Sequence, residues 1–358
     1  MKLNFFKNTI IYIMAPANID TGGPKDLHQL GFELKNLGKK VFMYYFPKEN
    51  KNPINDNYKI YNLPFTNEII DSEQNILIIP EINTSIRLSR KYKKIQKTIW
   101  WLSLDFFFIT NFQDNFSKFF RSVLKLPYNI IKLFHKITLN TYGNLSLSKY
   151  LKFIYLKYPF INTVKIKDIK INFSQSEYQL KVLKSKKIHS LLLTDYIRDE
   201  FFEAGKSISI KNKKNIICYN PRKSSSYMKK IMKDNSNLKF IPLINFSMNE
   251  LIKILSESKI YMDFGFHPGA DHLPREAAIL KNCVITNIEG SAFYFESLSI
   301  PEQFKYEEKK KNLKKIKKKI LEIFENFEYE NSKFNNYRIK LNNQKKIFSL
   351  QVKNIFDV

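Results

Sequence analysis

The first fifty residues hold the feature that most restricts the fold, a strand–helix–strand pattern with short connections. An apolar run at 10–14 is followed by Thr21-Gly22-Gly23-Pro24, where the glycines permit a tight turn. Pro24 suits the first position of a helix, because its missing N–H has no partner to lose there. Leucines at helical spacing follow, Gly38 ends the helix, and a second apolar run spans 41–46. This order predicts two parallel strands joined by a right-handed crossover.

The same alternation continues along the chain and predicts an α/β fold. Further strands are expected at 75–80, 98–102, 169–173, 190–194, 215–219, 238–244, 260–264 and 283–286. A capping box at Ser247 to Glu250 predicts a helix start, and 313–327 reads as a long basic helix. The polar stretch 205–214 is the expected linker. We therefore predict two Rossmann-like domains facing a central cleft: 1–204, 213–335, and a segment 336–358 that packs back on the first.

The composition indicates a folded chain, and the net charge of the chain has two interpretations. Hydrophobic residues make up 44% of the 358 positions, which is enough for two cores. The net charge of +27 suits polyanions such as phosphorylated substrates, anionic lipid or nucleic acid, or it is plain solvated surface. The two cysteines, Cys218 and Cys283, lie in apolar runs and are expected as small buried side chains. No run approaches the roughly 18 apolar residues of a membrane span, and the N-terminal run is interpreted as a strand.

A helical insertion with aromatic and basic character is expected at about 106–168. Its apolar positions recur at helical spacing with lysines beside them. Two interpretations stay open: an interfacial element that contacts anionic lipid, or helices packed on their own sheet.

Polar chemistry concentrates between Asp263 and Ser291, where a predicted strand ends and a helix begins. The helix N-terminus offers unpaired N–H groups and a partial positive charge, both suited to a diphosphate. Gly265 and Gly269 allow close backbone approach, and His267 and Arg275 can donate to phosphate oxygens. Glu276, expected in the first helical turn, can accept hydrogen bonds from ribose hydroxyls, and Ser291 follows a second glycine. Each residue alone has an ordinary structural explanation, whereas their grouping on one loop favours a binding site.

This segment resembles the donor-binding region of GT-B glycosyltransferases, and more closely a group of bacterial glycosyltransferase-like proteins associated with surface polysaccharides. The resemblance rests on five motifs that span most of the chain outside 106–168. They are Thr21-Gly22-Gly23-Pro24, Trp100-Trp101-Leu102-Ser103, Gln175-Ser176-Glu177-Tyr178, Tyr219-Asn220-Pro221, and His267-Pro268-Gly269 with Pro274-Arg275-Glu276-Ala277-Ala278.

The resemblance implies a hexosyltransferase that takes a sugar from a nucleotide-sugar donor. Glu276 would bind the donor ribose. The other implied donor-binding residues are Gly22, Gly23, Tyr219, Asn220, His267, Pro268, Gly269, Asp271, Arg275 and Ser291. Two departures stand out: Pro268 occupies the place of a second acidic residue eight positions before Glu276, and Ala270 and His272 stand where basic residues are expected. Retaining stereochemistry therefore does not follow.

The remaining expectations concern the base, cofactors and partners. An inverting enzyme needs a base to deprotonate the acceptor hydroxyl; Asp105 is the first candidate, with Glu81 and His28 behind it. No tightly bound cofactor and no metal are expected, because no aspartate pair resembles a metal site and the fold uses helix dipoles and basic side chains instead. The expected partners are a nucleotide-sugar, a glycan or lipid-linked acceptor and, peripherally, an anionic inner membrane from the cytoplasm.

Three other functions remain open. A nucleotide-sugar epimerase would share the architecture and need no acceptor. A non-catalytic polyanion-binding protein would use the positive charge, but no nucleic-acid reader motif occurs and nucleic acid is not an expected partner. An inactive scaffold is the third.

Overall fold

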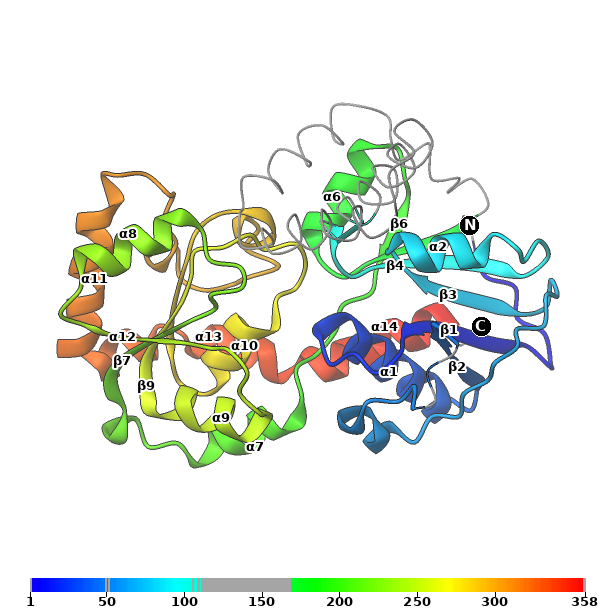
Figure 1. Cartoon of the computed structure of the whole chain (residues 1–358), viewed down its shortest axis with the longest axis horizontal. Helices are drawn as coiled ribbons and strands as arrows, with labels where there is room; N and C mark the ends of the chain where they lie inside the picture. The colour runs from blue at the N-terminus through cyan, green and yellow to red at the C-terminus, as the bar shows by residue number, and fades with distance from the viewer. Residues whose placement is uncertain are drawn as a thin grey trace, which may run out of the picture. The chain divides into compact units, whose positions relative to one another are not determined.

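The structure is a computed structural model that describes residues 2–48, 50, 52–104, 106–107, 110 and 169–356 (Figure 1). Nearly all of the predicted insertion at 106–168, and the candidate base Asp105, lie outside the described residues. The described chain forms two compact units. Unit 1 holds the residues up to 110, 169–196 and 345–356, and unit 2 holds 197–344.

Unit 1 is built on a six-stranded sheet in the order β2-β1-β3-β4-β5-β6, with every pair parallel. The strands are apolar runs with buried central positions, as expected for a parallel sheet covered on both faces. They are β1 (Ile10–Pro16), β2 (Lys40–Phe46), β3 (Ile76–Pro80), β4 (Gln96–Trp101), β5 (Ile169–Ser174) and β6 (Ser190–Leu192). The predicted parallel crossover between the first two strands is confirmed.

The helices of unit 1 come from the N-terminal third, the middle and the C-terminal end of the chain. They are α1 (Gly22–Asn36), η1 (Asp56–Tyr61), α2 (Asn83–Ser89), α6 (Glu177–Ser185) and α14 (Gln344–Phe356). In α14, Phe348, Val352 and Phe356 recur every four residues and are fully buried in the unit 1 core. The Phe348 ring stacks 6.2 Å from Trp100 of β4, so α14 completes this core (Figure 1).

Unit 2 is a smaller parallel sheet in the order β10-β9-β7-β8. Its strands are β7 (Lys214–Tyr219), β8 (Lys239–Pro242), β9 (Ser258–Asp263) and β10 (Cys283–Thr286). Its helices are α7 (Asp199–Ser207), η5 (Ile210–Asn212), α8 (Ser226–Asp234), α9 (Met248–Glu257), α10 (His272–Ile279), η6 (Gly290–Phe293), η7 (Glu302–Phe304), α11 (Asn312–Glu325), α12 (Phe327–Ser332) and α13 (Asn335–Asn342).

Several local predictions for unit 2 are confirmed. Ser247 and Glu250 form the reciprocal capping box at the start of α9. Ile316, Ile320 and Ile323 of α11 are fully buried, and the exposed side of the helix carries Lys314, Lys315, Lys317 and Lys318. The helix packs beside α8 (Figure 1). Both cysteines are free and buried.

Two helices begin earlier than predicted. α1 begins at Gly22 and α10 at His272, so that Pro24 and Pro274 each take the third helical position. The first four N–H groups of a helix have no intrahelical partner, and proline is therefore tolerated throughout the first turn. As a consequence, Gly22 and Gly23 belong to helix α1 instead of a loop, and Glu276 lies in the second turn of α10 instead of the first.

The stretch 205–214, expected as a linker, is instead structured within unit 2. It contains the end of α7, the turn η5 and the first residue of β7. A Cβ on Gly205 would lie 2.7 Å from the Ile279 carbonyl oxygen, so α7 packs closely on the end of α10. Tertiary packing therefore orders a segment whose polar composition indicated a linker.

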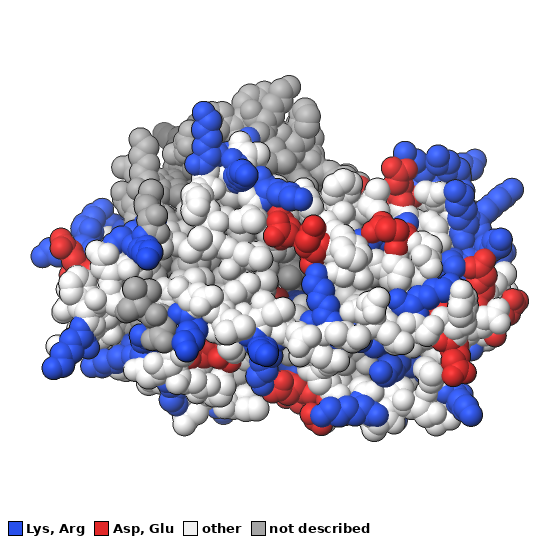
Figure 2. Space-filling model, turned by 180° about the vertical axis from the view of Figure 1, so that it is seen from behind, with Lys and Arg blue, Asp and Glu red and all other residues white. Residues whose placement is uncertain are grey.

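No helix among the described residues is long and apolar enough to cross a bilayer. Figure 2 shows lysine and arginine side chains spread over one face, with acidic and uncharged residues between them. The positive charge of the chain is therefore distributed on this face and does not form one continuous patch.

Candidate functional site

Three loops of unit 2 meet at the carboxyl edge of its sheet. They follow β7, β9 and β10 and lead into α8, α10 and η6. The strands are parallel, so their carboxyl ends share one edge, which is where ligands bind in open α/β sheets. Residue pairing joins two of these loops directly, because Ser224 forms an isolated antiparallel bridge with Gly265.

Two glycines let these loops approach one another. A Cβ on Gly265 would lie 2.4 Å from the Lys223 carbonyl oxygen. Gly290 has a φ of +57°, and a Cβ there would lie 2.1 Å from the His267 carbonyl oxygen. The next residue, Ser291, donates its N–H to that same oxygen at 2.8 Å and its hydroxyl to the Gly269 carbonyl at 2.6 Å. The β9–α10 and β10–η6 loops are therefore locked together by backbone contacts that only glycine permits.

A charged chain runs through the β9–α10 loop. His267 is buried, and its Nδ1 lies 2.8 Å from an Asp271 carboxylate oxygen. Lys223, from the β7–α8 loop, forms an ion pair with the other oxygen of Asp271. Burial alone would raise the pKa of Asp271, but the Lys223 ammonium and the His267 ring hold that pKa well below its ordinary value. Asp271 is also the N-cap of α10, which places this charge pair at the helix N-terminus.

Asp263, at the end of β9, is a second buried carboxylate beside this chain. The Tyr261 hydroxyl donates to one of its oxygens at 2.9 Å. Burial raises the pKa of Asp263, although the His267 ring acts against this. Burial acts to lower the pKa of His267, but Asp263 and then Asp271 outweigh it, so that the pKa is raised above its ordinary value. Among the described residues, Oδ1 of Asp263 and Nε2 of His267 have no hydrogen-bond partner.

Arg275 supports the loop from within the protein. Its side chain is only 2% exposed. The guanidinium donates to the carbonyl oxygens of Ala270 at 2.5 Å and Asp271 at 3.0 Å, and to Gln344 at 3.2 Å. A bidentate grip on phosphate by Arg275 remains a prediction, and these contacts indicate that the side chain holds the loop backbone.

The other predicted donor-side residues gather at the same edge of unit 2. Glu276 is nearly buried on α10, at 8% exposure. Pro268 and Gly269 lie on the β9–α10 loop. Tyr219 ends β7 and Asn220 follows it, and both are half-buried. The structure brings them to one edge, whereas Gly22 and Gly23 lie in unit 1. Sequence reasoning missed Lys223, and its position two residues after the Tyr219-Asn220-Pro221 motif was the available signal.

In unit 1, Glu81 lies just beyond β3 and is 3% exposed. Its two carboxylate oxygens accept the backbone N–H groups of Leu102 at 3.1 Å and Ser103 at 2.9 Å. Burial raises the pKa of Glu81 to about 7, in spite of these hydrogen bonds. The side chain thus anchors the end of β4, and its pKa near neutrality keeps it a chemically reasonable base.

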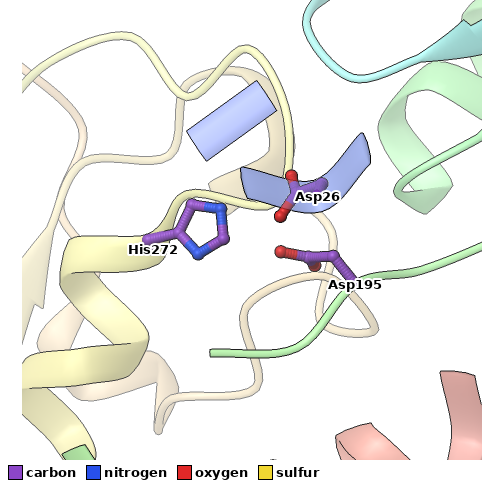
Figure 3. A group of neighbouring side chains, drawn as sticks. All are labelled: Asp26, Asp195 and His272. Atoms are coloured by element: carbon purple, nitrogen blue, oxygen red, sulfur yellow. The ribbon is translucent and has the colours of Figure 1, made fainter. Parts of the chain in front are cut away.

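A buried charged cluster lies at the start of α1. Figure 3 shows the carboxylates of Asp26 and Asp195 turned toward one another; His272, also drawn there, belongs to α10 of unit 2. Lys25 Nζ lies 3.2 Å from Asp26 and 4.0 Å from Asp195, and donates to the Tyr196 carbonyl at 2.7 Å. The Gln175 amide donates to Asp26 at 2.7 Å. Sequence reasoning missed both aspartates, because the cluster joins residues that are far apart in the sequence. Asp26 and Gln175, for example, are 149 residues apart.

His28, a weaker base candidate like Glu81, has both ring nitrogens paired within unit 1. Its ring nitrogens lie 2.6 Å from the Pro24 carbonyl oxygen and 2.8 Å from the Tyr45 hydroxyl. Its ring stacks 4.4 Å from that of Tyr58. Burial lowers the pKa of His28 to about 4, so that the ring is neutral at pH 7. A pocket of about 200 Å³ lies beside it, lined by Tyr45, Tyr58, Lys59 and neighbours.

Comparison with solved structures shows the fold. No protein-family model matches the sequence, and no curated protein matches it. HepE from Anabaena in complex with UDP-glucose is 7% identical, with a TM-score of 0.57 over 97% of this chain and 99% of that one. Sucrose-phosphate synthase from Thermosynechococcus elongatus is 11% identical, with a TM-score of 0.59 over 98% of both chains. Trehalose-6-phosphate synthase OtsA is 10% identical, with a TM-score of 0.51 over 98% and 99%. The chain therefore has the GT-B fold, with two Rossmann-like halves.

Proposed function

We propose that this protein is a glycosyltransferase that takes a sugar from a nucleotide-sugar donor, with the donor bound by unit 2. The observation that carries the proposal is the edge where the β9–α10 loop meets the N-terminus of α10. There a helix N-terminus lies beside the Lys223 ammonium, on loops that the close backbone contacts of Gly265 and Gly290 hold together. These are the features that bind a diphosphate. The GT-B fold, shared with HepE bound to UDP-glucose, supports the same assignment.

In this proposal, different residues of unit 2 bind different parts of the donor. The N–H groups at the start of α10, with Lys223 and Gly269, face the diphosphate, and Ser291 supports them by binding the His267 and Gly269 carbonyl oxygens. Glu276 accepts the ribose hydroxyls, and the end of β7 at 219–220 borders the nucleoside. His267 and Arg275 hold the loop, since both are nearly fully buried. The helix dipole and Lys223 would stabilise the leaving diphosphate without a metal.

Unit 1 provides the acceptor side of the proposal. The acceptor is a glycan or a lipid-linked glycan, the transferred sugar a hexose, and the setting surface-polysaccharide synthesis at the cytoplasmic face of an anionic membrane. These finer assignments rest on the motifs and on the charge of +27. Glu81 is a base candidate with a pKa of about 7, and Asp105 is retained from its position after the Trp-Trp-Leu-Ser motif. Gly22 and Gly23, in the first turn of α1, keep the donor-binding role that the Thr-Gly-Gly-Pro motif implies.

Thermal unfolding with UDP, GDP, CMP and ADP tests donor binding. A nucleotide at a hundred times its Kd should stabilise the protein by about 2.7 kcal/mol. Glu276→Ala should remove this shift, because the ribose loses its acceptor. Glu203→Ala is the matched control, since Glu203 is an exposed residue of α7 in the same unit. If all four nucleotides leave the unfolding temperature unchanged at millimolar concentration, the proposal is refuted.

The products distinguish a glycosyltransferase from the alternative, a nucleotide-sugar epimerase. A glycosyltransferase releases nucleoside diphosphate in proportion to the acceptor present, whereas an epimerase consumes its substrate without one. Incubating the protein with the stabilising nucleotide-sugar, with and without a mixed glycan acceptor, distinguishes the two.

A further inference from the structure

Four charged groups of unit 2 form one chain that joins two of its loops, β7–α8 and β9–α10. It runs from Lys223 on the β7–α8 loop to Asp271 at the start of α10, then to His267, and reaches Asp263 at the end of β9. Apart from Lys223, whose side chain is 37% exposed, these groups are nearly removed from water. The β10–η6 loop meets His267 through backbone atoms only, at Gly290 and Ser291.

With both carboxylates ionised, the charges of this chain balance when the imidazole is protonated. Lys223 and a charged His267 then face two carboxylates, Asp271 and Asp263. A neutral imidazole would leave a surplus negative charge buried beside the helix N-terminus, which is costly in a low-dielectric site. That surplus charge would also repel the diphosphate that the proposed function places there.

Two buried polar atoms without hydrogen-bond partners also favour a protonated imidazole. Nδ1 of His267 is already paired with Asp271, so a second proton on the ring resides on Nε2. Within the described residues, Nε2 of His267 lacks an acceptor and Oδ1 of Asp263 lacks a donor. A donor and an acceptor, both buried and both unsatisfied, are complementary to each other when the ring is charged.

His267 does not contact a ligand in this arrangement. Its side chain is 1% exposed, so it cannot reach a phosphate oxygen from where it lies. It lies at the junction of the loops: its carbonyl receives the Ser291 N–H, and its ring holds the N-cap residue Asp271. His267 therefore affects ligand binding indirectly, by holding the loops in place.

We propose that His267 and Asp263 are positioning residues: the protonated imidazole, held between Asp263 and Asp271, keeps the β9–α10 loop in its donor-binding form, so that donor affinity falls when the imidazole loses its proton. This inference rests on the proposed donor site in unit 2. It assigns to His267 a role different from direct phosphate contact, and it adds Asp263, which the sequence motifs did not single out.

The sign of the pH dependence follows from linkage. The pKa of His267 is raised in the folded protein, so the favourable charge pairing is complete at low pH and is lost as pH rises through that pKa. An anionic donor raises the pKa further. Donor affinity should therefore decrease above the free-protein pKa by up to about tenfold per pH unit, the limit for one linked proton.

The test measures the affinity of a nucleotide-sugar between about pH 6 and pH 9 by titration calorimetry. The probes are UDP-glucose, GDP-mannose and ADP-glucose, because their diphosphates are diesters and do not titrate in this range, unlike free UDP. The best-bound probe is then compared on wild type, His267→Gln and Asp263→Asn. His189→Gln is the matched control, since His189 is an exposed histidine of unit 1.

A loss of at least about tenfold in affinity across this range for wild type and the His189 variant, against a change below about twofold for His267→Gln, supports the proposal. Asp263→Asn should shift the midpoint to lower pH. Equal pH profiles in wild type and His267→Gln would overturn the inference while leaving the proposed function intact. Failure of every probe to bind wild type at any pH would overturn both.

A second measurement covers the case in which a variant does not fold. The ring resonance of His267 in the wild-type protein, one of five histidines, should titrate above the ordinary histidine pKa of about 6.5 and move to higher pH with the probe. A ring that is neutral throughout this range refutes the proposal without any variant.

Discussion

Gly290→Ala tests whether the loop geometry of unit 2 depends on a residue without a side chain. Gly290 has a φ of +57°, which costs an L-residue about 1 kcal/mol. Its Cβ would also lie 2.1 Å from the His267 carbonyl oxygen and 2.8 Å from the carbonyl carbon. Both are backbone atoms, so no side-chain rotation relieves the clash. The loops must separate, which breaks the two hydrogen bonds from Ser291 at about 1 kcal/mol each.

The expected loss of stability is therefore about 3 kcal/mol, with nucleotide-sugar affinity lowered at least about tenfold. Gly38→Ala is the matched control, because Gly38 has a φ of +72° and nothing within 4 Å of its Cβ position. That variant should lose only the conformational share, about 1 kcal/mol, and keep its affinity. Calorimetric unfolding and nucleotide titration measure both effects. A Gly290→Ala protein no less stable than Gly38→Ala, with unchanged affinity, would show that the loops do not depend on this close approach.

Two further predictions concern unit 1. The pKa of Glu81 is raised from 4.5 to about 7, so the wild type should lose up to about 3 kcal/mol of stability as pH rises between these values. Glu81→Gln should flatten this dependence in denaturant titrations at several pH values; an unchanged slope would mean that Glu81 titrates normally. Phe348→Ala should destabilise unit 1 by about 3 to 5 kcal/mol, because the ring is fully buried against Trp100 and Tyr196. Exposed Phe293→Ala is its control, and equal unfolding midpoints would refute the role of α14 in the core.

The alternation of apolar runs and helical spacing was enough to predict the strands and most helices. The capping box at Ser247 and the apolar face of α11 are local signals, because both depend on neighbours within one helix turn or a few turns. The starts of α1 and α10 were misplaced because a proline fits any position of the first turn, so that Pro24 and Pro274 mark a helix start only to within two residues.

The candidate donor loop was predictable as a segment, because its residues are close together in the sequence. The roles of its members were not. Arg275 and His267 carry groups that suit phosphate, but burial directs Arg275 to carbonyl oxygens and His267 to Asp271. Burial is a property of the folded chain, and a residue type alone does not state what it faces.

The sequence by itself thus determined a parallel α/β fold and the segment in which its binding chemistry gathers, since both follow from periodicity and local composition. Tertiary structure decided which charges meet. Lys223 reaches Asp271 across 48 residues, and Asp26 reaches Gln175 across 149. The carboxyl ends of parallel strands converge at one edge whatever their separation along the chain, and that convergence leaves no local pattern in the sequence.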